Sequence, residues 1–340
     1  MDQILSFFNE NIVGILIMFV LGVFFIVKGG DLFVDAASWL AEVSGIPKFI
    51  IGATVVSLAT TLPELLTSVF ATVDGQLEIA IGNAVGSVTA NIGLIMGISL
   101  LCIPSEIKRR QFAPQALMMA FAAAILCIAA PTGSVGVVVS VILLAVFAVF
   151  MWRNVSSAIA DREEATVELA DTKPSGKVIF VNIAKFVLGA AGIVLGADML
   201  VEYGTLIAEI SGIPENIIAI TLVAIGTSLP ELVTTITAIV KKQASLSVGN
   251  IIGANIFDLT LILPICSFVS GGKLTVAQPQ YAANWPEVFS AGLDFPVCLA
   301  VGLISIVPPI ITKKFYRWQG VLLILVYIVY IISTCMLQGV

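Results

Sequence analysis

The sequence contains no histidine among its 340 residues. This absence excludes the Ser-His-Asp hydrolases, the HExxH zinc enzymes and haem proteins with a histidine axial ligand. A GxxxxGK[ST] loop is also missing, so we expect no nucleotide hydrolysis by this chain. Charged residues make up only 11% of the chain, whereas soluble proteins carry about 25%.

Charged and sulfur-containing residues are sparse and scattered. The net charge of −6 is spread among loops, and no basic tract of the kind that binds nucleic acid is present. The five cysteines lie far apart, mostly in apolar runs, and are expected to fill the core rather than form disulfides or bind metal. They are Cys102, Cys127, Cys266, Cys298 and Cys335.

Hydrophobic residues dominate what remains. They form 59% of the chain, the mean hydropathy is +1.10, and apolar runs of about 20 residues recur along the whole length. These runs lack the alternation of a membrane β-barrel, so helices are predicted. The N-terminal MDQILSFFNENIVG is acidic before its apolar run, unlike a signal peptide.

We predict an all-α integral membrane protein with ten transmembrane helices. Their ranges are 12–38, 48–73, 79–101, 113–130, 135–152, 178–206, 215–240, 246–270, 292–311 and 318–337. The only long polar stretch, 153–177, is interpreted as a cytoplasmic linker between a first five-helix half (1–152) and a second (178–340).

Basic residues in the loops predict the orientation. With the N-terminus outside, thirteen face the cytoplasm and only Lys273 faces the other side. The thirteen are Lys48, Lys108, Arg109, Arg110, Arg153, Arg162, Lys173, Lys177, Lys241, Lys242, Lys313, Lys314 and Arg317. We therefore expect a multi-pass protein of the plasma membrane with both termini extracytoplasmic.

The chain carries an internal repeat. Residues 44–97 and 211–264 are identical at 22 of 54 positions at a fixed offset of 167. Pro63 matches Pro230, and Glu64 matches Glu231. Because each half has five helices, the second enters the membrane from the opposite face, which predicts inverted-topology repeats. Secondary transporters of this plan bind their substrates near the midplane, on interrupted helices.

Glu64 and Glu231 each lie near the centre of a predicted span. A charged side chain there costs at least about 2.5–3.5 kcal/mol. No lysine or arginine occurs in 49–73, 79–101, 215–240 or 246–270, so bound cations are the preferred counter-charge. The alternative is a protonated glutamate hydrogen-bonded between helices.

Oxygen donors surround both glutamates in the sequence. Pro63 and Pro230 interrupt their helices and free the carbonyl groups of 57–61 and 224–228. An amide and a carboxylate, Asn91 and Asp258, each follow a glutamate by 27 residues. The small residues of 82–91 and 249–258 allow close helix packing. An all-oxygen site favours Ca²⁺ over Zn²⁺ or Cu⁺.

At these residues the chain resembles the cation/Ca²⁺ exchanger superfamily, in particular the prokaryotic Na⁺/Ca²⁺ exchangers. The resemblance is carried by ATTLPE (59–64) and GTSLPE (226–231), each followed by GNxxG at the same spacing. It implies that Glu64 and Glu231 are the acidic Ca²⁺ ligands. The other residues that it implies as ion ligands are Ser57, Thr60, Thr61, Ser87, Asn91, Ala224, Thr227, Ser228 and Asp258.

The chain departs from the family pattern in three ways. Thr61 stands where the family often has serine, and its hydroxyl should still bind an ion. Ala254 occupies the position paired with Ser87, so one hydroxyl of a Na⁺ site is missing. The short linker has no room for the large cytoplasmic Ca²⁺-regulatory insertion of the animal exchangers.

We therefore expect a secondary antiporter rather than an enzyme, with Ca²⁺ and Na⁺ as transported ions and no cofactor. Its environment is the lipid bilayer, and no protein partner or nucleic acid is implied. The alternatives are a Ca²⁺/H⁺ antiporter, a K⁺-dependent Na⁺/Ca²⁺ exchanger, which shares an aspartate at Asp258, and an ion channel. An intramembrane aspartyl protease is disfavoured because the YD and GxGD motifs are absent.

Overall fold

The computed structural model describes residues 11–102, 107–165, 174–211, 226–276 and 290–337. Within these ranges, eight helices are long and apolar enough to cross a membrane. They are Ile12–Ser44, Leu77–Cys102, Arg109–Thr132, Val137–Ala160, Gly176–Ile210, Ala244–Val269, Gly292–Thr312 and Arg317–Thr334. Many large apolar side chains on their outer faces are exposed, as lipid-facing surfaces require. The protein is an all-α membrane protein.

A ninth span is formed by two helices with a bend between them. The segments Lys48–Thr60 and Leu62–Val73 meet at 44°. The first segment comprises α3 (Lys48–Ile51), a π-helical turn η1 (Gly52–Val56) and α4 (Ser57–Thr60), and the second is α5. Of the tenth predicted span, 215–240, the described part is α13 (Leu229–Val240); residues 212–225 lie outside the described ranges.

The remaining elements follow in chain order. They are α2 (Ile12–Ser44), α6 (Leu77–Ala90), η2 (Asn91–Met96), α7 (Gly97–Cys102), α8 (Arg109–Ala129), η3 (Ala130–Thr132), β1 (Ser134–Gly136), α9 (Val137–Ala165), α10 (Gly176–Ile210), α14 (Ala244–Phe257), η5 (Asp258–Ile262), α15 (Leu263–Val269), β2 (Lys273–Thr275), η6 (Ser290–Asp294), α16 (Phe295–Thr312) and α17 (Arg317–Leu337).

Two helices are longer than predicted. Helix α9 continues to Ala165, through thirteen residues that we predicted as linker, and α10 begins at Gly176 rather than 178. The segment Arg153–Ala165 is rich in alanine, glutamate and arginine, which are good helix formers in water. Hydropathy marks where the apolar run ends, but a helix can continue beyond the membrane.

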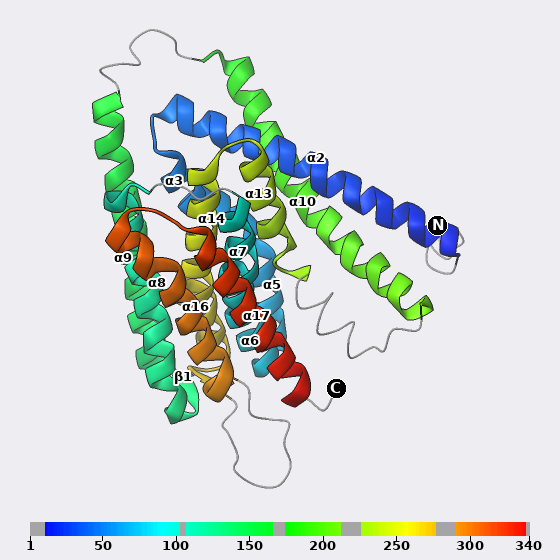
Figure 1. The fold of residues 1–340 in the computed structure, drawn as a ribbon, viewed down its shortest axis with the longest axis vertical. Coiled ribbons are helices and arrows are strands. Elements are labelled where there is room, and N and C mark those ends of the chain that lie inside the picture. The colour runs from blue at the N-terminus through cyan, green and yellow to red at the C-terminus, as the bar shows by residue number, and fades with distance from the viewer. Residues whose placement is uncertain (1–10, 103–106, 166–173, 212–225, 277–289, 338–340) are drawn as a thin grey trace.

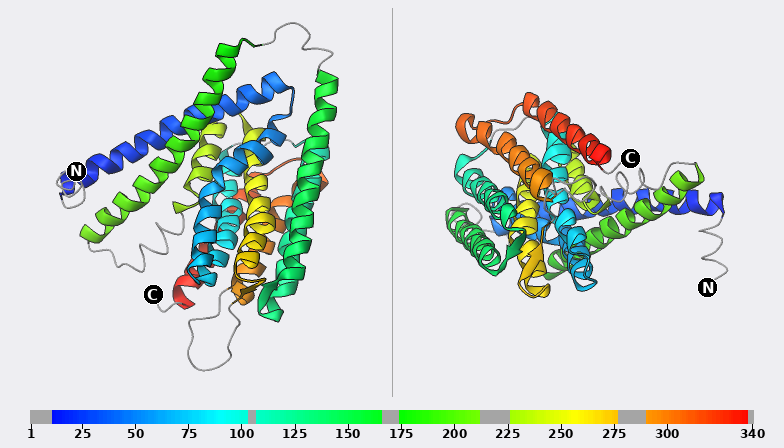
Figure 2. Two further views of the ribbon diagram at one scale, coloured as in Figure 1. Left: turned by 180° about the vertical axis from the view of Figure 1, so that it is seen from behind. Right: turned by 90° about the horizontal axis from the view of Figure 1, so that it is seen from below.

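Helices α2 and α10 form a long pair inclined to the rest of the bundle (Figures 1 and 2). They pack through glycine: a Cβ on Gly189 would lie 2.6 Å from the Phe33 nitrogen, and one on Gly196 would lie 2.6 Å from the Ile26 nitrogen. The glycines therefore allow the two backbones to touch.

Helix α14 lies at the centre of the remaining bundle. Residues 246–257 are all buried, and the helix contacts α3, η1, α4 and α13. A Cβ on Gly249 would collide with the Phe49 carbonyl, and one on Gly253 with the Ala53 carbonyl. This close approach brings a helix of the second half of the chain against the bent span of the first.

The two ends of the bundle are defined by different elements. At one end the N-terminal residues of α3, α8 and α14 line a common cavity. At the other end β1 and β2 form a short antiparallel sheet, in which Ser134 pairs with Thr275 and Gly136 with Lys273. The α14–α15 unit thus runs from the first end to the second, whereas α6–α7 runs the opposite way (Figure 1).

Candidate functional site

Each glutamate of the repeat lies in the first turn of a helix that starts at a Leu-Pro pair. In the first copy, α4 ends at Thr60 and α5 starts at Leu62, with Pro63 in its first turn. In the second copy, Ser228 precedes α13, with Pro230 in its first turn. The first-turn N–H groups of a helix favour a negative charge beside them, so both interruptions suit an anionic side chain.

The three acids are withdrawn from solvent. Glu64 is 1% exposed, Glu231 0% and Asp258 1%. Burial disfavours the charged form of each acid, so each of them needs a counter-charge or a proton. The ion pairs of the described residues join Lys48 to Glu42 and Lys241 to Asp31 and Asp35, so none neutralises these three acids.

Polar contacts cross between the two repeats at this position. The Thr61 hydroxyl donates to Glu231 Oε1 at 3.4 Å, and the Thr60 hydroxyl donates to Asn250 Oδ1 at 3.3 Å. Thr61 and Glu231 are 170 residues apart in the sequence, and Thr60 and Asn250 are 190 residues apart. The two copies of the repeat therefore contribute to one polar region in the interior of the bundle.

Many buried oxygens of this region have no hydrogen-bond donor among the described residues. They are both carboxylate oxygens of Glu64 and of Asp258, Glu231 Oε2, Asn91 Oδ1 and the Ser228 hydroxyl. Unsatisfied buried oxygens are costly unless something neutralises them. No three acidic or cysteine side chains of the described chain form a single metal-holding cluster. Any one cation would therefore take its remaining oxygens from hydroxyls, amides and carbonyls, as Ca²⁺ and Na⁺ can.

Two π-helical segments begin at the amide and the third acid. Asn91 starts η2, and Asp258 starts η5. Segment η2 contacts α13, which carries Glu231, and η5 contacts α5, which carries Glu64. Wide turns of this kind are frequent at functional sites. Each one here faces the glutamate helix of the other repeat.

The other residues predicted from the sequence are placed as follows. Ser57 (0% exposed), Thr60, Thr61 and Ser87 (3% each) are buried, and Thr227 is half-buried. Thr227 lines a cavity of about 200 Å³ together with Pro63, Pro230 and Asp198. Ala254, the counterpart of Ser87, is fully buried. Ala224 lies outside the described residues.

Sequence reasoning missed three amides in this region. The Asn83 side chain donates to the Glu64 carbonyl at 3.1 Å and to the Ser68 hydroxyl at 2.9 Å. Asn250 accepts from Thr60, and Asn255 accepts from the Asn91 amide at 3.1 Å. The repeat alignment contained a signal for Asn83 and Asn250, which match each other. For Asn255 it contained none, because Val88 stands at the equivalent position.

Comparison with known proteins adds independent information. Residues 14–155 and 181–336 match the family described as sodium/calcium exchanger protein. The chain belongs to this family. It is 31% identical to the sodium/calcium exchanger MaX1 of Methanosarcina acetivorans, over 93% of this chain and 97% of that protein. It is 33% identical to the inner membrane protein YrbG of Escherichia coli, over 76% and 80% of the two chains.

A solved structure of the sodium-calcium exchanger NCX_Mj is also similar. It superposes with a TM-score of 0.76 at 29% identity, over 94% of this chain and 98% of that one. The resemblance found at the repeat motifs is thus confirmed over almost the whole chain, and the protein has the fold of a sodium/calcium exchanger.

Proposed function

We propose that this protein is a secondary antiporter that extrudes Ca²⁺ in exchange for Na⁺ entering down its gradient. The observation that carries the proposal is the set of buried carboxylates, contributed by both repeats, for which the described residues provide no cationic partner. Transported cations supply the missing charge, and the family relationship supports Na⁺ and Ca²⁺ as those cations.

The proposed ligands are the residues that the resemblance implies. Glu64 and Glu231 bind Ca²⁺ directly, Thr61 and Ser228 supply hydroxyls beside them, and Asn91 and Asp258 complete the central site from η2 and η5. Thr60 and Thr227 offer oxygens to the flanking Na⁺ positions. Ser57 and Ala224 contribute backbone carbonyls, and Ser87 contributes a hydroxyl to a Na⁺ position. The cavity at Thr227 and Asp198 supports a route by which ions reach the interrupted helices.

Exchange proceeds by alternating access to this one region. Three carboxylates carry a charge of −3 when ionised, which three Na⁺ balance, whereas one Ca²⁺ leaves one charge over. Na⁺ and Ca²⁺ therefore compete, and we propose that Asp258 is neutral when Ca²⁺ is bound. Residues 1–152 and 178–340 form the two inverted halves, in a plasma membrane with both termini extracytoplasmic.

Ion flux into proteoliposomes tests the proposal. ⁴⁵Ca²⁺ uptake should be driven by internal Na⁺ at fixed pH, and neither internal K⁺ nor a pH step should replace Na⁺. Uptake driven by the pH step alone would make the protein a Ca²⁺/H⁺ antiporter. A requirement for K⁺ in addition to Na⁺ would place it with the K⁺-dependent exchangers, and conductance without counter-ion coupling would make it a channel.

A further inference from the structure

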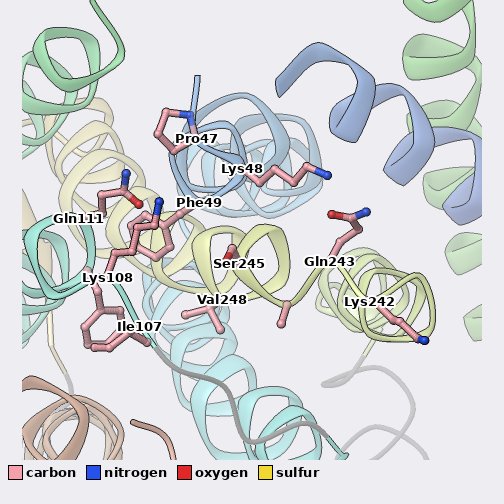
Figure 3. Close-up of a pocket in the computed structure, with 12 residues that line it drawn as sticks. Pro47, Lys48, Phe49, Ile107, Lys108, Gln111, Lys242, Gln243, Ser245 and Val248 are labelled. Carbon is pink, nitrogen blue, oxygen red and sulfur yellow. The ribbon is translucent and has the colours of Figure 1, made fainter. Parts of the chain in front are cut away.

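A cavity of about 620 Å³ lies at the end of the bundle where α3, α8 and α14 begin. Its walls come from 47–49, 107–112 and 242–248, three segments far apart in the sequence (Figure 3). None of these residues belongs to the buried acidic region. A concave site of this size is typical of small-molecule binding, so the cavity is a separate feature of the molecule.

The charge of the cavity is positive. Lys48, Lys108 and Lys242 line it, and none of the described lining residues is acidic. The Lys48 ammonium pairs with Glu42 at 2.9 Å, while Lys108 and Lys242 have no ion pair with the described residues. Glu106, which precedes this wall in the sequence, lies outside the described residues. A positively charged mouth repels Ca²⁺ and Na⁺, so the cavity does not suit an entrance for cations.

The backbone adds to the positive potential. Helices α8 and α14 both begin on the cavity wall, and neither has a side-chain cap or an acidic residue in its first turn. Among the described residues no side chain caps either helix, as at helix ends that receive anions.

Lys242 occupies an unusual backbone position on the rim. Its φ is 58°, in the left-handed region, and at the matching position of the first repeat Gly75 has a φ of 78°. This left-handed backbone conformation costs a lysine more free energy than a glycine. In Figure 3 its side chain extends away from the centre of the cavity, but its four flexible carbons let the ammonium swing toward a bound anion.

The walls are also partly apolar. Phe49, Ile107, Phe112 and Val248 contribute side chains, and Phe49 and Phe112 are buried. The cavity lies at the end of the helices that the loop charges assign to the cytoplasm, and the ends of membrane-spanning helices are where lipid headgroups are expected. Basic pockets between transmembrane helices on that side bind anionic headgroups.

From these observations we propose that the cavity binds an anionic phosphate group, supplied by a phospholipid headgroup of the cytoplasmic leaflet. Lys108 and Lys242 pair with the phosphate, the α8 and α14 N-termini donate to its oxygens, and the apolar wall contacts the start of the acyl chains. One anion would thereby join α8 to α14, the helix that leads to Asp258.

Native mass spectrometry of the full chain, titrated with phosphatidylglycerol, tests this proposal. In Lys108→Gln/Lys242→Gln we expect affinity to fall about 5-fold for each lysine, or roughly 25-fold for both. Ser245→Glu, which adds a negative charge to the cavity, should weaken binding without removing a lysine. The matched control is Arg153→Gln/Lys177→Gln, which removes two exposed charges from the same predicted side but outside this cavity.

The possible results distinguish a lipid headgroup, free phosphate and the absence of a specific site. Loss of phosphatidylglycerol binding in the cavity variants alone, with no competition from millimolar inorganic phosphate, supports the lipid headgroup. Displacement by inorganic phosphate would instead make free phosphate the ligand. Equal affinity in the cavity and control variants, or equal affinity for phosphatidylcholine, would overturn the proposal. These measurements require no ion transport, so their result is independent of the proposed antiport.

Discussion

The Asn91 side-chain amide donates a hydrogen bond to Asn255 Oδ1 at 3.1 Å, across 164 residues of sequence. Both side chains are buried, and the Asn255 amide in turn contacts the Met119 sulfur at 3.7 Å. Because an amide has one donor end and one acceptor end, this bond orients Asn91 so that its Oδ1 accepts no hydrogen bond from the described residues. We therefore expect Asn255 to orient Asn91, a proposed ligand, through this hydrogen bond.

Replacing Asn255 by leucine should weaken Ca²⁺ binding. The Asn91 amide would lose its acceptor and could turn its NH₂ toward the acids. Loss of groups that orient metal ligands typically lowers affinity 10- to 100-fold, and we expect a decrease in this range in equilibrium dialysis with ⁴⁵Ca²⁺. Asn182→Leu is the control, since Asn182 is only half-buried and its hydrogen bond among the described residues goes to the Val178 carbonyl of its own helix. Unchanged affinity in Asn255→Leu would remove its positioning role.

Asp258→Asn should preserve Ca²⁺ transport and impair Na⁺ coupling. Asparagine resembles the neutral Asp258 side chain that we propose for the Ca²⁺-bound state. In the Na⁺-bound state, the variant lacks one of the three negative charges that balance three Na⁺. We expect Ca²⁺/Ca²⁺ exchange to stay within about 10-fold of wild type, a change of about 1.4 kcal/mol, while Na⁺-driven uptake falls further. Asp74→Asn, at an exposed turn, serves as the control. Abolition of Ca²⁺ transport at every pH would contradict the assignment.

Gly249→Ala should destabilise the protein. The added methyl group would collide with the Phe49 carbonyl, which is backbone and cannot rotate away. Overpacking of this kind costs about 1–3 kcal/mol, observable as a lower thermal unfolding temperature in detergent. The paired control is Gly302→Ala in α16, where the nearest atom, Met119 Cε, would lie 3.9 Å from the new carbon. Equal stability of the two variants would argue against the close packing of α14.

Lys241 links the inclined helix pair to the bundle. Its ammonium lies 2.7 Å from Asp35 Oδ1 and 3.0 Å from the Asp31 carbonyl of α2. Because both aspartates are partly exposed, Lys241→Met should cost no more than about 1 kcal/mol of stability. The Lys241→Met substitution should nevertheless broaden the distribution of distances between spin labels on α2 and α14. Lys177→Met is the control. An unchanged distribution would show that this link does not restrain α2.

The sequence predicted the features that follow from local chemistry. The interruption before Glu64 follows from Pro63 and is confirmed by the bend after Thr60. The membrane class follows from apolar composition and is confirmed by the long apolar helices. The motifs around both glutamates were sufficient to identify the exchanger family.

Features that depend on tertiary contacts could not be predicted. The sequence names Thr61 as a ligand but could not show that its hydroxyl donates to Glu231 of the other repeat. Asn255 has no counterpart in the first repeat, so comparing the copies gave it no weight. The length of α9 depends on helix propensity beyond the membrane, to which hydropathy is insensitive.

The central claim is that one transported cation is held jointly by the acids of both repeats. Equilibrium dialysis with ⁴⁵Ca²⁺, without Na⁺, tests it directly on the wild type, Glu64→Gln and Glu231→Gln. We predict saturable binding by the wild type and its loss in each variant, although each retains one glutamate and Asp258. Wild-type affinity in either variant would contradict the claim.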